Sequence, residues 1–290
     1  MMVNKSTIHI IAGPTASGKS ARALEIAREQ NGVIINCDSL QIYDALHILT
    51  AHPSNEEKQE IPHRLYGTLH TNGVCSAGNW REMVEPVIHE VINNGQTPII
   101  CGGTGLYIRA LTDGLSPMPD IPEEVRESVV ARYEEIGAEA FYAELKSRDP
   151  IMAERFHVNH KARIIRAMEV LDATGKSLAQ WQELPREAPP EDWDFTLHKV
   201  LPERETLYKR CNQRFEWMLE NGALEEVKAF DTRIQSGEVK DGVPICKALG
   251  YKELRSYLNG ENSREDAITA AQTSTRQYAK RQMTWLRNQL

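Results

Sequence analysis

The chain has 290 residues, 41% hydrophobic and 26% charged, which is typical of a soluble globular protein, and its net charge of −7 argues weakly against nucleic acid as a partner. No stretch approaches the roughly 18 consecutive apolar residues of a membrane span, and the first predicted strand begins too early to leave room for a signal peptide. Five scattered cysteines without a C-x-x-C pair argue against a disulfide framework or a zinc site, so we expect a cytoplasmic protein.

A phosphate-binding loop follows the first predicted strand. The apolar run Ile8–Ala12 leads directly into a Gly-rich turn that opens a helix, and in this context the pattern G-x-x-x-x-G-K-[ST] binds phosphate. Its backbone N–H groups and the helix N-terminus converge on an anion. Lys19 can reach terminal phosphate oxygens, and the Ser20 hydroxyl can coordinate Mg²⁺. We predict that a di- or triphosphate is bound by Gly13, Pro14, Thr15, Ala16, Ser17, Gly18, Lys19 and Ser20.

Strands and helices alternate along the first third of the chain. Apolar periodicity and turn residues predict a helix over Lys19–Gln30, a strand over Val33–Cys37, a helix over Ser76–Asn93 and a strand over Thr97–Cys101. Strands joined by helical crossovers form a parallel sheet whose functional loops lie at the carboxyl ends of the strands. We therefore expect residues 13–20, Asp38 and residues 102–104 to gather at one edge of the sheet.

Two proline-rich segments, 115–122 and 185–190, enclose a stretch with helical patterns only. Residues 195–201 return to strand character, and the remainder is helical. This organisation predicts an α/β fold: a P-loop NTPase-like parallel sheet core with an inserted all-helical domain and a helical C-terminal region. The predicted core comprises residues 1–117 and 193–290, and the predicted insertion comprises residues 118–192.

The acidic residues near the phosphate loop leave more than one interpretation open. Asp38 follows the second predicted strand, where it could be a magnesium partner, a general base or the N-cap of a helix. The strand over Thr97–Cys101 ends in Gly-Gly-Thr without the carboxylate that ATPases and GTPases use to hold Mg²⁺. The loop is thus free to hold a diphosphate as a leaving group.

Two basic clusters offset the acidic total. Arg163 and Arg166 are three residues apart on one predicted helix face, opposite Ile164 and Ile165. The C-terminal stretch 276–290 contains four cations and two aromatic residues but no acid. Such clusters are often merely solvated helix faces, but acid-free stretches with interleaved aromatic residues favour a nucleic-acid contact surface.

Together these residues resemble the bacterial type of the tRNA dimethylallyltransferase family, also called tRNA isopentenyltransferases. The matching strings follow the family order over nearly the whole chain and occupy residues 13–20, 38–43, 102–107, 163–170, 249–252 and 279–287. The resemblance implies transfer of a dimethylallyl group from dimethylallyl diphosphate to the exocyclic amine of adenosine 37, beside the anticodon of tRNA, by a monomer that uses Mg²⁺ on Ser20. ATP would at best compete for the loop.

The resemblance also implies that the insertion, residues 118–192, is a tRNA-binding domain, and it implies roles for single residues. Asp38 would accept the proton of the amine, Thr104 would hydrogen-bond at the reacting centre, and Arg214 would neutralise the leaving diphosphate. The anticodon stem-loop of tRNA would be contacted by Asp38, Ser39, Leu40, Gln41, Thr104, Arg126, Ala162, Arg163, Ile164, Ile165, Arg166, Lys247, Gly250, Tyr251, Lys252, Lys280, Arg281, Trp285 and Arg287.

The sequence departs from the family pattern at a few positions, and two other functions remain compatible with it. Residues 63–66 read His-Arg-Leu-Tyr where two histidines are expected, and Lys247 and Lys252 stand where arginines are common. An isopentenyltransferase that acts on free adenine nucleotides would share Asp38 and Thr104. A small-molecule kinase would share the phosphate loop, but it would leave the basic C-terminal stretch without a purpose.

Overall fold

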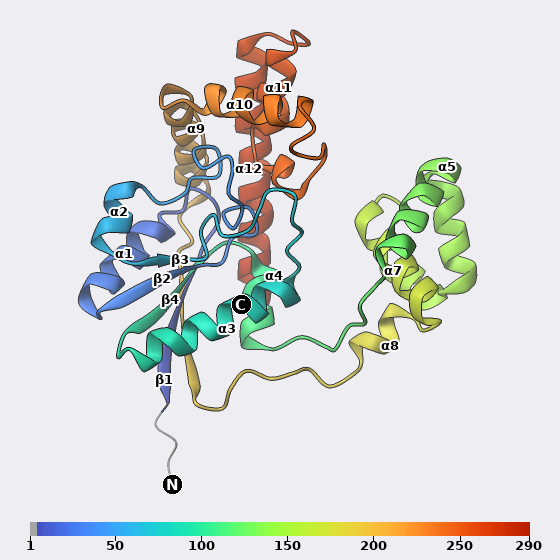
Figure 1. Cartoon of the computed structure of the whole chain (residues 1–290), viewed down its shortest axis with the longest axis horizontal. Coiled ribbons are helices and arrows are strands. Elements are labelled where there is room, and N and C mark those ends of the chain that lie inside the picture. Colours follow the sequence, from blue (N-terminus) through green and yellow to red (C-terminus); the bar gives the residue numbers. More distant parts are fainter. Residues whose placement is uncertain (1–4) are drawn as a thin grey trace. The chain divides into compact units, whose positions relative to one another are not determined.

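The computed structural model describes residues 5–290, which divide into two compact units (Figure 1). The first unit extends to Thr112 and resumes at Pro190, and the second comprises Asp113–Pro189. The sequence analysis placed these boundaries a few residues later along the chain. Each unit has a hydrophobic core of its own, and the two are described separately below.

The first unit is built on a five-stranded parallel sheet, which confirms the predicted α/β class. The strands are β1 (Ser6–Ala12), β2 (Gly32–Asn36), β3 (His63–Arg64), β4 (Thr97–Gly102) and β5 (Trp193–Lys199), in the spatial order β3-β2-β4-β1-β5. Every neighbouring pair is parallel. The sequence analysis missed β3, because a strand of two residues has no detectable period.

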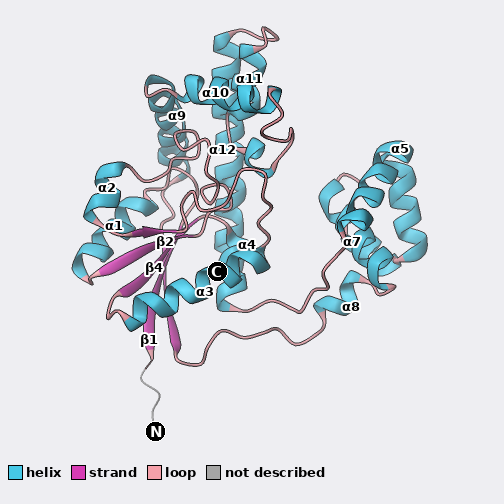
Figure 2. Cartoon of the chain, viewed as in Figure 1, coloured by secondary structure: helices cyan, strands magenta, loops and turns pink. Residues whose placement is uncertain are grey.

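Helices cover both faces of this sheet (Figure 2). Because successive side chains of a strand point to opposite faces, Ile34 and Ile99 pack with the apolar side of α1 (Lys19–Glu29), whereas Ile35 and Ile100 pack with that of α3 (Ala77–Asn93). Burial on both faces explains the continuous apolar runs of these strands. The other helices of this part are α2 (Asn55–Glu60) and α4 (Gly105–Thr112).

Helices make up the C-terminal part of the first unit. They are α9 (Arg204–Glu220), α10 (Ala223–Gln235), a 3₁₀ turn (Pro244–Lys247), α11 (Tyr251–Leu258) and α12 (Arg264–Gln289). The long helix α12 packs against α9, α11 and α4. Helices α9 and α12 thereby lie beside the phosphate loop, which they contact through polar side chains.

The second unit consists of α5 (Glu123–Arg148), α6 (Pro150–Arg155), α7 (Lys161–Thr174) and α8 (Leu178–Gln182). Its core contains Phe141, Leu145, Ile164 and Met168, all fully buried. The assigned span of α5 is interrupted at Gly137, whose φ of +80° is a conformation that favours glycine. The span therefore comprises two helices, and the second begins near Ala138.

Candidate active site

The phosphate loop connects β1 to α1 and forms a tightly wound turn. A side chain at Gly13 would place its Cβ 2.5 Å from the Ser17 hydroxyl oxygen, and Gly18 has a φ of +95°. Both positions therefore require glycine. Lys19 lies at the start of α1, and its Nζ donates a hydrogen bond to the Pro14 carbonyl at 3.4 Å. This contact holds the Lys19 ammonium against the loop, where it could contact a bound phosphate.

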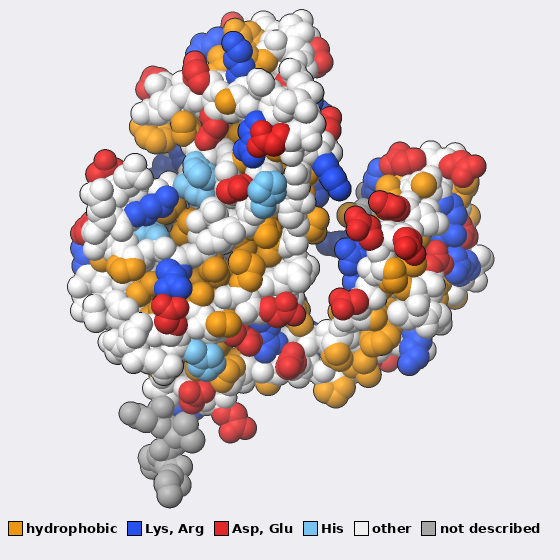
Figure 3. Space-filling view, in the orientation of Figure 1, with side chains coloured by type: hydrophobic (Ala, Val, Ile, Leu, Met, Phe, Trp, Pro, Cys, Tyr) orange, Lys and Arg blue, Asp and Glu red, His pale blue; other side chains and the backbone are white. Residues whose placement is uncertain are grey.

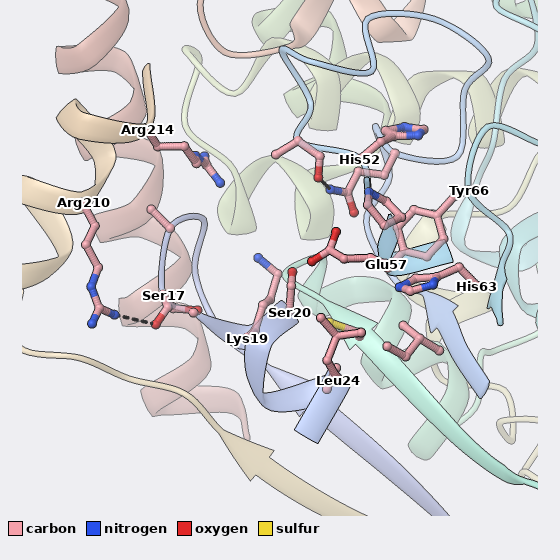
Figure 4. A pocket seen from close by; sticks show the side chains of 18 residues that line it. Ser17, Lys19, Ser20, Leu24, His52, Glu57, His63, Tyr66, Arg210 and Arg214 are labelled. Atoms are coloured by element: carbon pink, nitrogen blue, oxygen red, sulfur yellow. Dashed lines mark hydrogen bonds between the residues drawn. The ribbon is translucent and has the colours of Figure 1, made fainter. Parts of the chain in front are cut away.

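Two arginines of α9, one helical turn apart, donate hydrogen bonds to the phosphate loop. The guanidinium of Arg210 donates a hydrogen bond from Nη1 to the Ser17 carbonyl at 3.0 Å (Figure 4). The guanidinium of Arg214 donates from Nη2 to the Thr15 hydroxyl. Arg214 is thus placed at the loop as the resemblance implies. Arg210 was not predicted, although its i,i+4 relation to Arg214 places both on one helix face.

The C-terminal helix α12 also holds the loop, through Gln282. The Oε1 of this buried side chain accepts a hydrogen bond from the Thr15 backbone N–H at 2.8 Å, and its Nε2 donates to the Gly103 carbonyl at 3.0 Å. Gln282 therefore joins the loop after β1 to the loop after β4. The sequence analysis quoted the string 279–287 but assigned no role to Gln282.

A cavity of about 440 Å³ opens beside the phosphate loop (Figure 4). Its wall combines the cations and hydroxyls of the loop and of α9 with polar side chains from the segment between β2 and β3. The side chains that matter below are those of Ser17, Lys19, Ser20, His52, Glu57, His63, Tyr66, Arg210 and Arg214. We call it the loop cavity.

A second cavity, of about 350 Å³, lies at the carboxyl end of β2. Asp38, Thr15, Phe215 and Tyr278 are among its lining residues, and so is Arg214, which also lines the loop cavity. We call it the Asp38 cavity. The guanidinium of Arg214 therefore stands between a space bordered by Lys19 and a space bordered by Asp38.

Asp38 lies at the start of a turn, and no helix begins there. Its Oδ1 accepts a hydrogen bond from the Leu40 backbone N–H at 3.0 Å, and the next helix, α2, starts only at Asn55. The helix N-cap interpretation is therefore wrong. Within residues 5–290 the Oδ2 atom has no hydrogen-bond partner, so one carboxylate oxygen is available in the cavity.

Thr104 lies against the segment that carries Asp38, as predicted for loops at one sheet edge. Its hydroxyl accepts a hydrogen bond from the Ser39 backbone N–H at 3.0 Å and donates one to the Ser39 hydroxyl at 3.4 Å. Thr104 lines a smaller neighbouring cavity together with Tyr278 and Arg281. Tyr278, which borders both this space and the Asp38 cavity, is a wall residue that the sequence analysis did not propose.

Two half-buried cations without ion-pair partners dominate the electrostatics of the site. Burial lowers the pKa of Lys19, an effect that Asp38 and Cys101 oppose, and burial also lowers the pKa of Arg214. Neither residue belongs to any ion pair in the described part of the chain. Two desolvated cations without a carboxylate partner are costly unless an anion binds them. The site is therefore suited to a polyanionic ligand.

The remaining predicted contacts of the first unit fall into three groups. Lys247, Lys252, Lys280, Arg281 and Arg287 are exposed cations. By contrast, four predicted contacts are engaged inside the protein. The Gln41 side-chain amide donates hydrogen bonds to the Thr50 and Ala51 carbonyls. Gly250 is the N-cap of α11 and lies against Phe215, and the buried Tyr251 ring packs edge-on against Phe230. The Trp285 ring packs over Gly105. Leu40 and Ser39 are half-buried next to Asp38.

In the second unit, only part of the predicted contact set reaches the surface. Arg126, Ala162 and Arg163 are exposed, and Arg166 forms an ion pair with Glu169 at 3.1 Å. Ile164 and Ile165 are buried in the core, so assigning their side chains to an interface was wrong. Acidic and basic side chains alternate over the visible face of this unit (Figure 3), which is typical of a solvated surface.

Comparisons with known proteins all point to one family. A family model described as IPP transferase matches residues 41–289. A tRNA dimethylallyltransferase of Paramagnetospirillum magneticum is 47% identical over 282 residues, which cover 97% of this chain and 88% of that protein. The corresponding protein of Agrobacterium fabrum is 46% identical over 283 residues, with 97% and 93% covered.

Two solved structures have the same fold over almost the whole chain. A tRNA delta(2)-isopentenylpyrophosphate transferase of Staphylococcus epidermidis is 34% identical with a TM-score of 0.67, covering 99% of this chain and 91% of that one. A eukaryotic dimethylallyltransferase acting on tRNA is 26% identical with a TM-score of 0.79, covering 97% and 70%.

Proposed function

The chain belongs to the IPP transferase family, and from this membership we propose that it transfers a dimethylallyl group from dimethylallyl diphosphate to the exocyclic amine of adenosine 37 in tRNA. The relatives are named tRNA dimethylallyltransferase, so the reaction class is prenyl transfer and the acceptor class is tRNA. No helix within residues 5–290 is long and apolar enough to cross a membrane. We expect a monomer that works in the cytoplasm.

The observation that carries the proposal is the position of Arg214 between the two cavities. A diphosphate in the loop cavity would contact Lys19 and Arg214, which both lack a carboxylate partner within residues 5–290. An adenine in the Asp38 cavity would lie beside a free carboxylate oxygen. Donor and acceptor would then meet at Arg214, which is the geometry that a transfer between two bound molecules needs.

The loop residues would promote departure of the diphosphate. As the bond between the allylic carbon and its oxygen breaks, negative charge grows on the diphosphate, and cations placed in advance in a dry site stabilise it. Lys19, Arg214 and the loop N–H groups provide that positive charge. The Ser20 hydroxyl is an oxygen donor suited to Mg²⁺, which would neutralise further charge on the diphosphate when bound.

Asp38 would act on the acceptor. The lone pair of the exocyclic nitrogen is delocalised into the adenine ring, so the amine becomes a good nucleophile only as it loses a proton. The new bond joins this nitrogen to the allylic carbon, and the proton passes to the free Oδ2 of Asp38. The Thr104 and Ser39 hydroxyls, linked to each other, border the same region and would orient the base.

The proposed binding partner is the anticodon stem-loop of tRNA, which would contact exposed cations of the protein. Exposed cations without acidic neighbours in sequence occur on α12, where Lys280, Arg281 and Arg287 are all solvent-facing. Exposed Arg126 and Arg163 provide further positive charge in the helical unit. Contacts from such side chains to phosphates would position the tRNA without reading its sequence.

The rival functions are distinguished by the acceptor. Radiolabelled dimethylallyl diphosphate should be offered together with bulk tRNA, AMP and ATP, and the label should enter the tRNA alone. Label in AMP or ATP would favour an enzyme of free nucleotides, and phosphate transfer from ATP to a small molecule would favour a kinase. The names of the relatives favour neither rival.

A further inference from the structure

A single carboxylate enters the loop cavity from the side opposite the phosphate loop. It belongs to Glu57 of α2, and in the close view it extends into the cavity from that helix, with Ser20 and Lys19 on the other wall (Figure 4). The strand β4 ends without an acidic residue, and Asp38 lines the other cavity. Glu57 is therefore the carboxylate that shares a cavity with the Ser20 hydroxyl, the proposed Mg²⁺ ligand.

Glu57 is fixed in place by a capping box at the start of α2. Its backbone N–H donates to the Ser54 hydroxyl at 3.2 Å, and its Oε2 accepts from the Ser54 backbone N–H at 2.7 Å. Oε1 has no hydrogen-bond partner in the described chain. The side chain is thus held in one orientation with one oxygen unused.

The loop cavity contains the Glu57 carboxylate on one wall and unpaired cations on the other. Glu57 belongs to no ion pair among the described residues. Burial lowers the pKa of His63, although Glu57 and a hydrogen bond to the Ile61 carbonyl partly oppose this effect. Burial also lowers the pKa of His52 to about 3. Glu57 is therefore a half-buried carboxylate that faces the site of a diphosphate across the loop cavity.

We infer that Glu57, together with Ser20, holds the divalent cation that accompanies the diphosphate. The Glu57 carboxylate and a diphosphate bound in the same cavity would repel each other unless a cation lay between them. Mg²⁺ prefers oxygen donors and is commonly bound by one or two carboxylates plus substrate phosphates. The inference rests on the proposed function, because the diphosphate provides the remaining ligands. No group of three or more acidic, histidine or cysteine ligands occurs within residues 5–290, so binding of metal and diphosphate should be mutually dependent.

The alternative is that Glu57 serves only to cap α2, and one substitution separates the two roles. Glutamine at the third helical position also completes a capping box, so Glu57→Gln should preserve the helix while removing the charge. Glu56→Gln is the matched control, because Glu56 is exposed on the same helical turn and does not line the cavity. Thermal unfolding of both variants should match the wild type.

The test measures Mn²⁺ binding by electron paramagnetic resonance, with and without inorganic diphosphate. We expect diphosphate to tighten Mn²⁺ binding to the wild type and to Glu56→Gln, and we expect the Kd for Mn²⁺ to rise about 10-fold or more in Glu57→Gln. Without metal, Glu57→Gln should bind diphosphate at least as tightly as the wild type, since a repulsive charge is gone. Loss of a helix cap alone would not weaken Mn²⁺ binding while leaving metal-free diphosphate binding as tight as in the wild type or tighter.

Equal Mn²⁺ affinity in the wild type and Glu57→Gln overturns the inference. A parallel assay of prenyl transfer by the wild type keeps this failure distinct from failure of the proposed function. Transfer to tRNA with unchanged Mn²⁺ binding in the variant refutes the role of Glu57 alone. Tight, Glu57-dependent Mn²⁺ binding without any prenyl transfer refutes the reaction and retains the metal site.

Discussion

Gln282 accepts a hydrogen bond from the backbone N–H of Thr15 at 2.8 Å, although the two residues are 267 positions apart. The same side chain donates to the Gly103 carbonyl. The geometry of the phosphate loop therefore depends on a buried amide near the end of the chain. This dependence explains why the sequence patterns at 13–20 and 279–287 belong to one site.

Replacing Gln282 by alanine should loosen the loop and destabilise the protein. The change leaves two backbone groups without partners, which should lower the free energy of unfolding by about 1–3 kcal/mol. We also expect weaker diphosphate binding, measured by calorimetry alongside chemical denaturation. Gln277→Ala, at an exposed position of the same helix, is the control. If the variant retains wild-type stability and diphosphate affinity, the loop is held by other contacts.

Lys19→Ala should reduce prenyl transfer by orders of magnitude. A charge contact to the leaving diphosphate in a dry site is worth roughly 3 kcal/mol or more in the transition state. Affinity for tRNA should change little, because Lys19 borders the loop cavity only. The measurements are single-turnover transfer rates and tRNA binding. Strong tRNA-stimulated ATP hydrolysis by the wild type, without prenyl transfer, would contradict the assignment of the loop to a prenyl diphosphate.

Asp38→Asn should lower the transfer rate about 10²–10⁴-fold, the usual worth of a general base. Asparagine can still accept the hydrogen bond from Leu40, so the turn should persist, and Kd values for donor and tRNA should stay near wild type. Single-turnover kinetics with saturating substrates measure the chemical step directly. Near-normal turnover would mean that Asp38 only shapes the turn.

Alanine substitutions at Lys280, Arg281 and Arg287 should each weaken binding to all tRNA substrates alike. If each residue contacts a phosphate, each substitution should reduce the salt slope of log affinity by about one unit. Turnover at saturating tRNA should persist, since these side chains lie outside the chemical step. Lys228→Ala, at an exposed position of α10, is the control. Unchanged slopes in all three variants would revive the free-nucleotide alternative.

His52 should make the protein less stable in acid. Burial lowers its pKa to about 3 from an ordinary value of 6.5, so below about pH 6.5 the unfolded chain binds a proton that the folded chain excludes. Stability should therefore fall as pH decreases, by up to about 2 kcal/mol between about pH 7.5 and 5. The Nε2 of His52 is buried without a hydrogen-bond partner within residues 5–290, so His52→Leu should fold.

Denaturant unfolding at the two pH values tests this expectation. The loss of stability on acidification should be smaller in His52→Leu than in the wild type. His89→Leu, which removes an exposed histidine, should leave the difference unchanged. An equal pH dependence in the wild type and His52→Leu would assign the effect to other groups.

Local patterns were sufficient to predict the parts of this molecule that are contiguous in sequence. The phosphate loop and the parallel sheet have periods and spacings that a single segment reveals. Arg210 and Gln282 were missed because each contacts the loop from a helix distant in sequence. Glu57 was missed because its position in the wall of the loop cavity is likewise not encoded in a local pattern. The strand β3 was missed because two residues show no alternation.

The errors in the helical unit have a different origin. Ile164 and Ile165 were included in the interface with Arg163 and Arg166, although helical periodicity places them on the opposite face. The structure follows the periodicity, because burying two isoleucines in the core contributes more than exposing them. Membership of a matching string does not by itself bring a side chain to the surface.

The position of the prenyl group in the product tests the central claim most directly. Unmodified tRNA should be incubated with the wild-type protein, Mg²⁺ and dimethylallyl diphosphate, then digested with nucleases and analysed by mass spectrometry. We predict one dimethylallyl group per tRNA, on the exocyclic amine of adenosine 37, and almost none with Lys19→Ala or Asp38→Asn. Modification at another nucleotide, or equal product from the Asp38→Asn variant, would contradict the assignment of the two cavities.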